Sequence, residues 1–301
     1  MKQIRWSRAL VHVACLCGAS LSMAQPSSGN GLGVPQAWMS PDVSAAWEMG
    51  FKGAGATMIF VDDFNSRSRF NGNLGEGLKR LRHGEWTLRE ASLIAPEANA
   101  RGQDFNSGRA VTLSSGLNVI NMSYGIYGRS NGRSNFNRQE QSIIGYATNG
   151  QAVVSKAAGN DGVHLDRPNA RGQVDTLNLA LRDKPTVIFV GALSTNGSTQ
   201  APADLASYSN KAGTDTRLQN HFLVVGTEGS KTMLNGTSFA APIVTGYAAI
   251  VGSKFTTATP VQITNQLLNT ARTDTIRRYD PVLHGRGEAS LSRALAPVGI
   301  Q

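Results

Sequence analysis

The sequence predicts a three-layer α/β/α domain, in which helices cover both faces of a mainly parallel central sheet. Apolar, β-prone runs recur along the chain, and segments with helical character separate most of them. Strands that alternate with helices are typical of parallel sheets, whose strands are buried on both faces. The expected strands are residues 56–61, 92–96, 117–122, 152–155, 186–192 and 222–225.

The expected helices occupy the segments between these runs. Ser40-Pro41-Asp42 has the chemistry of a helix start, and a long segment of apolar and small residues begins at Ser238. Pro242 falls in the first turn of that segment, where its missing N–H costs little. The expected helices begin near Ser40 and span 85–91, 139–148, 238–255 and 260–272, whereas 67–82 and 128–138 are rich in Gly, Asn and Arg and are predicted to be loops.

The composition indicates a folded domain. Of the 301 residues, 40% are apolar and 16% are charged, which argues against disorder. This length suits one large α/β domain or two small ones, and no linker or large internal repeat divides the chain. We therefore expect a short arm at 25–37, rich in Ser, Gly and Pro, and one domain at 38–301.

The first 24 residues have the pattern of a secretory signal peptide. Lys2, Arg5 and Arg8 precede an apolar run at 9–21, and Ser22-Met23-Ala24 fits a small-x-small cleavage site. The run is short for a membrane span. We expect cleavage after Ala24 and a secreted or periplasmic protein without stable membrane insertion; a retained N-terminal anchor is the alternative.

Both cysteines, Cys15 and Cys17, lie inside this signal, so the mature chain has no disulfide and no thiol chemistry. Removal of the three basic residues of the signal lowers the formal net charge from +9 to +6. This modest excess does not indicate a nucleic-acid partner.

Ser238 is the strongest candidate nucleophile. The first turn of a helix leaves backbone N–H groups unpaired and carries partial positive charge. A serine there can attack a carbonyl while its own N–H stabilises the oxyanion that forms. The alternative is an ordinary buried helix that begins with a capping Ser or Thr.

Gly236-Thr237-Ser238-Phe239-Ala240-Ala241-Pro242 resembles the nucleophile motif of subtilisin-like serine proteases, the subtilases. The resemblance covers nearly the whole mature chain. It implies their three-layer fold, hydrolysis of peptide bonds in polypeptide substrates, and a Ser-His-Asp triad in the order Asp, His, Ser. No cofactor is implied.

The strand ending in Asp62-Asp63 resembles the family's strand that ends in the catalytic Asp. The resemblance favours Asp62, although Phe64 replaces a typical Gly, so the choice between Asp62 and Asp63 stays open; a turn or capping acid is the alternative role. His83-Gly84 resembles the family's His-Gly at a helix start, but the residues that follow differ. A calcium-binding loop that many members carry after this segment has no room here, so we expect no metal site.

The segment 153–162, with Ala157-Ala158-Gly159-Asn160, resembles the family's oxyanion segment and implies that Asn160 is an oxyanion donor; its alternative role is a turn residue. Ser123-Tyr124-Gly125 resembles the segment that pairs with the substrate backbone. His284, in a Gly-x-Gly turn, is expected to be structural.

Two rival functions follow from the departures around His83 and Asp62. The first is a catalytically impaired subtilase fold that serves as a binding module. The second is another hydrolase, such as an esterase, although the Gly-x-Ser-x-Gly elbow of α/β-hydrolases is missing. The end of the chain at 291–299 also resembles the end of the protease part of subtilisin-like autotransporters, and the stretch before Asp62 is short for a folding propeptide.

Overall fold

The centre of the fold is a sheet of six parallel strands in the order β10-β9-β7-β5-β1-β4, which confirms the predicted parallel central sheet. The computed structural model describes residues 33–129 and 135–300. The strands are β1 (Ala56–Asp62), β4 (Asn99–Asp104), β5 (Leu117–Met122), β7 (Val153–Ala157), β9 (Val187–Leu193) and β10 (Phe222–Gly226).

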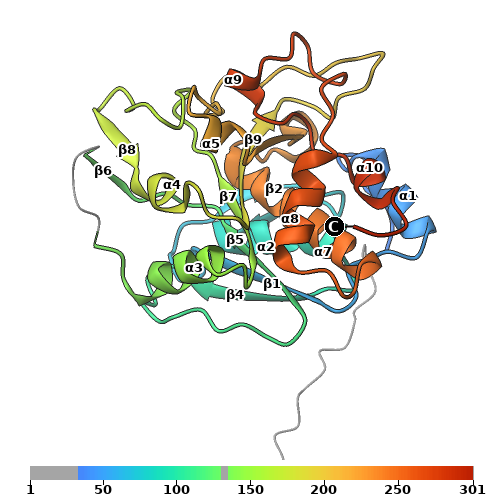
Figure 1. The fold of residues 1–301 in the computed structure, drawn as a ribbon, viewed down its shortest axis with the longest axis horizontal. Helices are drawn as coiled ribbons and strands as arrows, with labels where there is room; N and C mark the ends of the chain where they lie inside the picture. The colour runs from blue at the N-terminus through green and yellow to red at the C-terminus, as the bar shows by residue number, and fades with distance from the viewer. Residues whose placement is uncertain (1–32, 130–134, 301) are drawn as a thin grey trace, which may run out of the picture. The chain divides into compact units, whose positions relative to one another are not determined.

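Helices pack on both faces of this sheet and complete the three layers (Figure 1). One face is covered by α2 (His83–Ile94), α7 (Ala241–Lys254) and α8 (Pro260–Asn269). The opposite face is covered by α3 (Arg138–Thr148) and α4 (Thr176–Leu181).

The side chains of β1 show why the sheet needs a layer on each side. Met58 and Phe60 belong to the apolar cluster beneath α7, whereas Ile59 and Val61 belong to the cluster beneath α3. Successive residues of a strand point to opposite faces, and all seven residues of β1 are buried. Water is therefore excluded from both sides of the strand.

Helix α7 lies close to α2 because it has a glycine at their contact. A Cβ on Gly246 would lie 2.7 Å from Ile94 Cγ2 and 3.4 Å from Ala91 O. A larger side chain would push the two helices apart. The contact matters because α2 begins with His83 and the segment that leads into α7 contains Ser238.

Shorter elements surround the sheet. Two antiparallel pairs join β2 (Phe70–Gly72) to β3 (Lys79–Leu81) and β6 (Tyr127–Arg129) to β8 (Gln173–Asp175). The remaining helices are α1 (Pro41–Glu48), α5 (Thr216–Gln219), α6 (Gly229–Thr232), the 3₁₀ helix η1 (Thr237–Phe239), α9 (Pro281–His284) and α10 (Leu291–Leu295).

The predicted strand at 92–96 is wrong, because this segment contains the end of α2. Its apolar residues Leu93 and Ile94 lie on the buried side of that helix, and a short apolar run before a proline has no period that separates helix end from strand. Edge strand β4 was missed because its sequence, Asn-Ala-Arg-Gly-Gln-Asp, has no β-prone pattern.

The loop predictions were partly wrong. Residues 67–82 include the β2–β3 pair, and the segment predicted as a loop at 128–138 begins inside β6. Both pairs are short and rich in polar residues, so their strands have no apolar signal of their own. The last long helix, α8, ends at Asn269 rather than at 272.

The signal at 1–24 and most of the arm at 25–37 lie outside the described residues. Within the described part of the chain, no helix has the length and apolar character needed to cross a membrane.

Candidate active site

Three neighbouring strands bring the predicted site residues to one edge of the sheet. Asp62 ends β1, Ser123 follows β5, and Asn160 comes three residues after the end of β7. These strands lie next to one another in the order β7-β5-β1 and run in the same direction. The carboxyl ends of parallel strands are where α/β folds place their sites.

Asp62 and His83 are in direct contact. Asp62 Oδ1 lies 2.6 Å from His83 Nδ1, and the Asp62 carboxylate is buried whereas the His83 side chain is 28% exposed. A carboxylate accepts hydrogen bonds, so a neutral His83 carries its proton on Nδ1. The lone pair of Nε2 is then free to accept a proton.

Two further donors hold the Asp62 carboxylate. The Thr87 hydroxyl donates to Oδ2 at 3.0 Å, and the backbone N–H of Asp63 donates to Oδ1 at 2.6 Å. Thr87 lies one helical turn after His83, so both contact Asp62 from the same side of α2. Sequence reasoning missed Thr87, although the four-residue spacing from His83 was available as a signal.

The neighbouring carboxylate of Asp63 has a different contact. It accepts hydrogen bonds from the backbone N–H of Ser66, at 2.8 Å, and from the Ser66 hydroxyl. Partial burial raises the pKa of Asp63, but hydrogen bonds, chiefly those from Ser66, lower it by more. The pKa of Asp63 is therefore below its ordinary value. The geometry therefore places Asp62, not Asp63, against His83.

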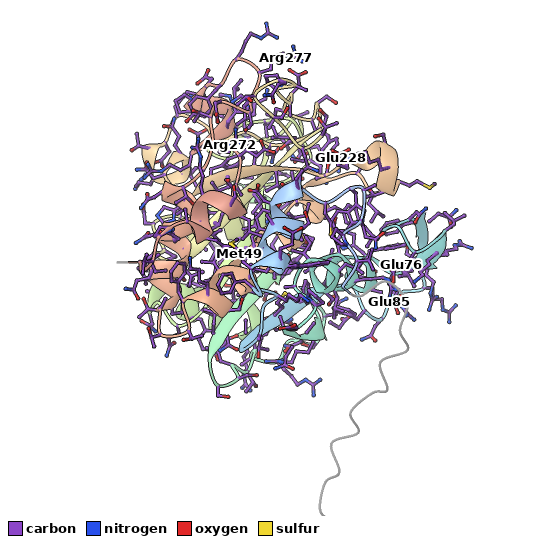
Figure 2. The ribbon with its side chains drawn as sticks, turned by 90° about the vertical axis from the view of Figure 1, so that its right-hand side faces the viewer. Met49, Glu76, Glu85, Glu228, Arg272 and Arg277 are labelled. Atoms are coloured by element: carbon purple, nitrogen blue, oxygen red, sulfur yellow. The ribbon has the colours of Figure 1, made fainter. Side chains whose placement is uncertain are left out.

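Helix α2 begins at His83 because the preceding residue is tied to the first turn. The backbone N–H of Arg82 donates to Glu85 Oε2 at 2.8 Å, and the Arg82 guanidinium donates to Glu85 Oε1 at 2.8 Å. Figure 2 shows Glu85 on the side of the molecule that carries the β2–β3 pair. The carboxylate of Glu85 thus accepts the backbone N–H of the residue before the helix, which is one half of a capping box and fixes where the helix starts. It thereby fixes the position of the imidazole.

Phe64, which stands where the family's typical glycine would be, covers Gly84. A Cβ on Gly84 would lie 2.8 Å from Asp63 O and 2.8 Å from the Phe64 ring. The backbone N–H of Gly84 also donates to Asp63 O at 3.0 Å. The junction between β1 and α2 therefore leaves no room for a side chain at position 84.

The resemblance implies that His83 acts together with Ser238, so we expect Gly84→Ala to lower kcat/KM about 100-fold, because a shift of this junction moves His83 away from Ser238. Overpacking should also lower the free energy of unfolding by about 1–3 kcal/mol. Gly145→Ala is the matched control, because a Cβ there meets nothing within 4 Å inside helix α3. Peptidase assays and urea denaturation would compare the two variants; equal effects would contradict this account of Gly84.

Ser238 lies in η1, just before α7, so the predicted helix at 238–255 begins with a 3₁₀ turn. Its hydroxyl donates to Ser123 O at 3.1 Å, and the Ser123 hydroxyl donates to Ser238 O at 2.9 Å. Within the described residues, the Ser238 hydroxyl makes no hydrogen bond to His83. Phe239, the residue after Ser238, does lie against His83: the centroids of the two rings are 5.5 Å apart.

The orientation of the Asn160 side chain follows from its contacts. The backbone N–H of Thr237 donates to Asn160 Oδ1 at 2.8 Å, and the Thr237 hydroxyl donates to the same atom at 3.0 Å. An N–H can only donate, so the atom it reaches is the amide oxygen. Asn160 Nδ2 has no acceptor among the described residues and lies 3.2 Å from the place of a Cβ on Gly236.

Gly236 leaves room for this amide beside the segment that contains Ser238. Its φ of 134° lies in the region that favours glycine, and a side chain there would crowd Asn160. The backbone N–H of Ser238 also has no acceptor within the described part of the chain. Two N–H donors, from Asn160 and Ser238, therefore remain unused beside the Ser238 hydroxyl.

The segment Ser123-Tyr124-Gly125 runs past these donors. The backbone groups of Tyr124 and Gly125 make no hydrogen bond to other described residues. The Tyr124 hydroxyl donates to Glu140 Oε1 at 3.0 Å, and its ring stacks on Phe105. Burial, followed by the charge of Glu140, raises the pKa of Tyr124, so its hydroxyl stays protonated.

Comparison with known proteins identifies relatives of this chain. A model of the subtilase family matches residues 82–291. Subtilisin DY of Bacillus licheniformis is 34% identical over 158 residues, which are 52% of this chain and 50% of that protein. Mycosin-1 of Mycolicibacterium smegmatis is 30% identical over 151 residues, which are 43% of this chain and 33% of that protein. The chain thus spans half or less of the length of these relatives.

Solved structures share the fold. The crystal structure of MycP1 from the ESX-1 type VII secretion system covers 85% of this chain and 85% of its own, with a TM-score of 0.57 and 21% identity. A lanthipeptide protease covers 84% of this chain and 91% of its own, with a TM-score of 0.55 and 18% identity. At these identities the likeness concerns the fold alone.

Proposed function

The chain belongs to the subtilase family, and from this premise we propose that it is a serine endopeptidase that uses Ser238 as its nucleophile. The observation that carries the proposal is the 2.6 Å contact between Asp62 and His83 beside the unused amide of Asn160. The family match begins at residue 82, so the role of Asp62 rests on this geometry.

The first step is attack of Ser238 Oγ on the peptide carbonyl. Rotation about the Cα–Cβ bond releases the hydroxyl from Ser123 O and turns it toward the imidazole. His83 Nε2 takes the proton as general base and later gives it to the leaving amine. Asp62 keeps the proton of His83 on Nδ1 and stabilises the imidazolium that forms.

The oxyanion develops on the carbonyl oxygen as the tetrahedral intermediate forms. The side-chain N–H of Asn160 and the backbone N–H of Ser238 are the donors for this charge. Because Thr237 holds Asn160 Oδ1 with two hydrogen bonds, the amide does not need to reorganise during the reaction. Thr237 is thus a positioning residue, which sequence reasoning did not assign.

The substrate backbone pairs with the open edge of Ser123-Tyr124-Gly125. An extended peptide adds itself as a strand to unpaired backbone groups, and side-chain pockets add preference. This places the scissile carbonyl next to Ser238, because Ser123 and Ser238 are in direct contact.

We expect Asn160→Asp to lower kcat about 10²–10³-fold with little change in KM. The carboxylate keeps the acceptor for Thr237 but replaces the N–H donor by an oxygen that repels the oxyanion. Asn137→Asp is the matched control, because Asn137 Oδ1 also accepts two backbone N–H groups, those of Gln139 and Glu140, and the change adds the same charge. Steady-state kinetics on a peptide substrate would separate the two; equal losses would contradict the donor role of Asn160.

The purified mature chain tests the function as a whole. We expect it to cleave casein and to react with a fluorophosphonate probe, with the adduct on the peptide that contains Ser238. Absence of both would favour the binding-module alternative. Hydrolysis of nitrophenyl esters without casein cleavage would favour an esterase.

Secretion or periplasmic export rests on the signal-like pattern of residues 1–24. Mass spectrometry of protein recovered outside the cytoplasm should find Gln25 as the first residue. An N-terminus that still carries residues 1–24 would support the retained anchor instead.

A further inference from the structure

The segments Ser123–Gly125 and Ala158–Asn160 follow β5 and β7, which are neighbours in the sheet. We call the region between these two segments, beside the proposed oxyanion donors, the slot. Each segment carries a glycine that is packed closely against other residues: a Cβ on Gly125 would lie 2.6 Å from Asp175 Oδ2, and one on Gly159 would lie 2.4 Å from Asn210 Nδ2.

The slot is where the P1 side chain of a substrate must go. The scissile carbonyl lies between Ser238 and Asn160, and the substrate backbone runs along Ser123–Gly125. With the carbonyl at Ser238 and the backbone along Ser123–Gly125, the side chain next to that carbonyl enters between the two glycine-containing segments.

Tyr127 occupies part of this slot. Its Cε2 would lie 3.1 Å from a Cβ on Gly125, and its hydroxyl would lie 3.5 Å from a Cβ on Gly159. The ring thus crosses from one wall to the other, although 43% of the residue remains exposed. An aromatic ring that is half exposed and lies across two glycines restricts the width of the slot.

Two contacts hold Tyr127 in this position. Its backbone belongs to β6, where it pairs with Asp175 of β8. Its hydroxyl also lies near the Asp161 carboxylate, whose charge acts on it. Burial, followed by the charges of Asp161 and Asp175, raises the pKa of Tyr127 to about 12, so the hydroxyl remains a donor at neutral pH.

The inner end of the slot contains a buried ion pair whose charges are already used. Lys156 Nζ lies 2.9 Å from Asp175 Oδ2, and both side chains are almost fully buried. Asp175 Oδ1 accepts from the backbone N–H groups of Ile126 and Leu177, each at 3.0 Å. Asp175 therefore has no free charge for a basic P1 side chain, and a second cation there would face Lys156.

We propose that Tyr127 determines P1 specificity by restricting the slot to small uncharged side chains, such as those of Gly, Ala and Ser. The inference rests on the proposed function and adds the substrate preference of the same site. A larger P1 residue must displace the ring, which means breaking its contacts with both walls and with Asp161. One methylene group in a pocket changes kcat/KM about 10–200-fold. Displacement of a whole aromatic ring should therefore lower kcat/KM for large P1 residues at least about tenfold.

Peptide substrates that differ only at P1 test the proposal. For the wild-type chain we expect kcat/KM with P1 Ala to exceed that with P1 Phe at least about tenfold. Tyr127→Ala should raise kcat/KM for P1 Phe about tenfold or more and change that for P1 Ala much less. Tyr127→Phe keeps the ring and should keep the wild-type preference for Ala.

Met49→Ala is the control for loss of a large exposed side chain, since Met49 is 50% exposed at the end of α1 (Figure 2). It should leave the ratio between the two substrates unchanged. Sequencing of the cleavage products of wild-type casein digests gives the P1 preference without any variant.

Two results would overturn the proposal: a wild-type chain that cleaves after Phe as well as after Ala, or a Tyr127→Ala variant with an unchanged ratio. Labelling of Ser238 by a small fluorophosphonate separates these results from failure of the proposed function, because such a probe needs no P1 side chain. A labelled enzyme with the wrong preference rejects only the role of Tyr127, whereas an unlabelled chain rejects the function.

Discussion

Replacement of Ser238 by alanine is expected to lower kcat about 10⁶-fold, the magnitude established for loss of the nucleophile in subtilisin. Without Oγ, no covalent intermediate can form, and only the oxyanion donors and substrate binding contribute to the rate. The folded state should change little, because the side chain loses one partly exposed hydrogen bond, to Ser123 O, worth about 1 kcal/mol. Casein cleavage and fluorophosphonate labelling would measure the loss.

Ser253→Ala is the matched control for this change. Ser253 lies near the other end of α7, and its hydroxyl also donates to a backbone carbonyl, that of Ile250 at 2.7 Å, while it accepts from the backbone N–H of Gly53 at 3.2 Å. We expect its activity to remain within about twofold of the wild-type value, as for surface changes away from a site. Casein cleavage retained by Ser238→Ala, or a fluorophosphonate adduct on that variant, would contradict the assignment of the nucleophile.

The place of the site could be predicted from the sequence because its signals are local. Apolar runs mark β1, β5 and β7, and Asp62, Ser123 and Asn160 lie at or just beyond their carboxyl ends. A parallel sheet brings such ends to one edge. The start of the helical segment that contains α7 could also be predicted from the sequence, because small residues and Pro242 occur there.

Contacts between distant segments could not be predicted in the same way. The Phe64 ring covers Gly84 and Gly102, so a residue that departs from the family pattern has a packing role that only the fold makes visible. Tyr127 is in the slot because β6 pairs with β8, more than forty residues away. Neither of these short strands shows an alternation of apolar and polar residues, so the local sequence does not predict that they pair.

A contact between distant segments also holds the side chain of Asn160 in place. The motif around Ser238 contains Thr237, whose backbone and hydroxyl both reach Asn160 Oδ1. The Thr237 hydroxyl in turn accepts from the backbone N–H of Gly159 at 3.0 Å. The segments that carry the proposed nucleophile and the proposed oxyanion donor are therefore one hydrogen-bonded unit, although Asn160 and Thr237 are 77 positions apart in the sequence.

The second large effect is expected for Asp62→Ala, which should lower kcat about 10⁴-fold. The change removes the acceptor for His83 Nδ1–H, so the imidazole loses its fixed tautomer and the charge that stabilises the imidazolium. The loss should be smaller for Asp62→Asn. The backbone N–H of Asp63 donates to Oδ1, which favours an amide oxygen facing His83, while the Thr87 hydroxyl can accept from the amide nitrogen. Single-turnover kinetics with a peptide substrate would measure the chemical step in each variant.

Asp63→Ala is the decisive control, because it removes the adjacent carboxylate while leaving the Asp62–His83 contact in place. Its carboxylate accepts hydrogen bonds from the backbone N–H and the hydroxyl of Ser66, so we expect a loss of about 1 kcal/mol in the free energy of unfolding and less than tenfold in kcat. A loss of about 10⁴-fold for Asp63→Ala, with Asp62→Ala nearly active, would reverse the assignment of the two acids. Equal losses would instead mean that the turn after β1 acts as a unit, because His83 reaches its position only through the contacts of that turn with Gly84 and Phe64.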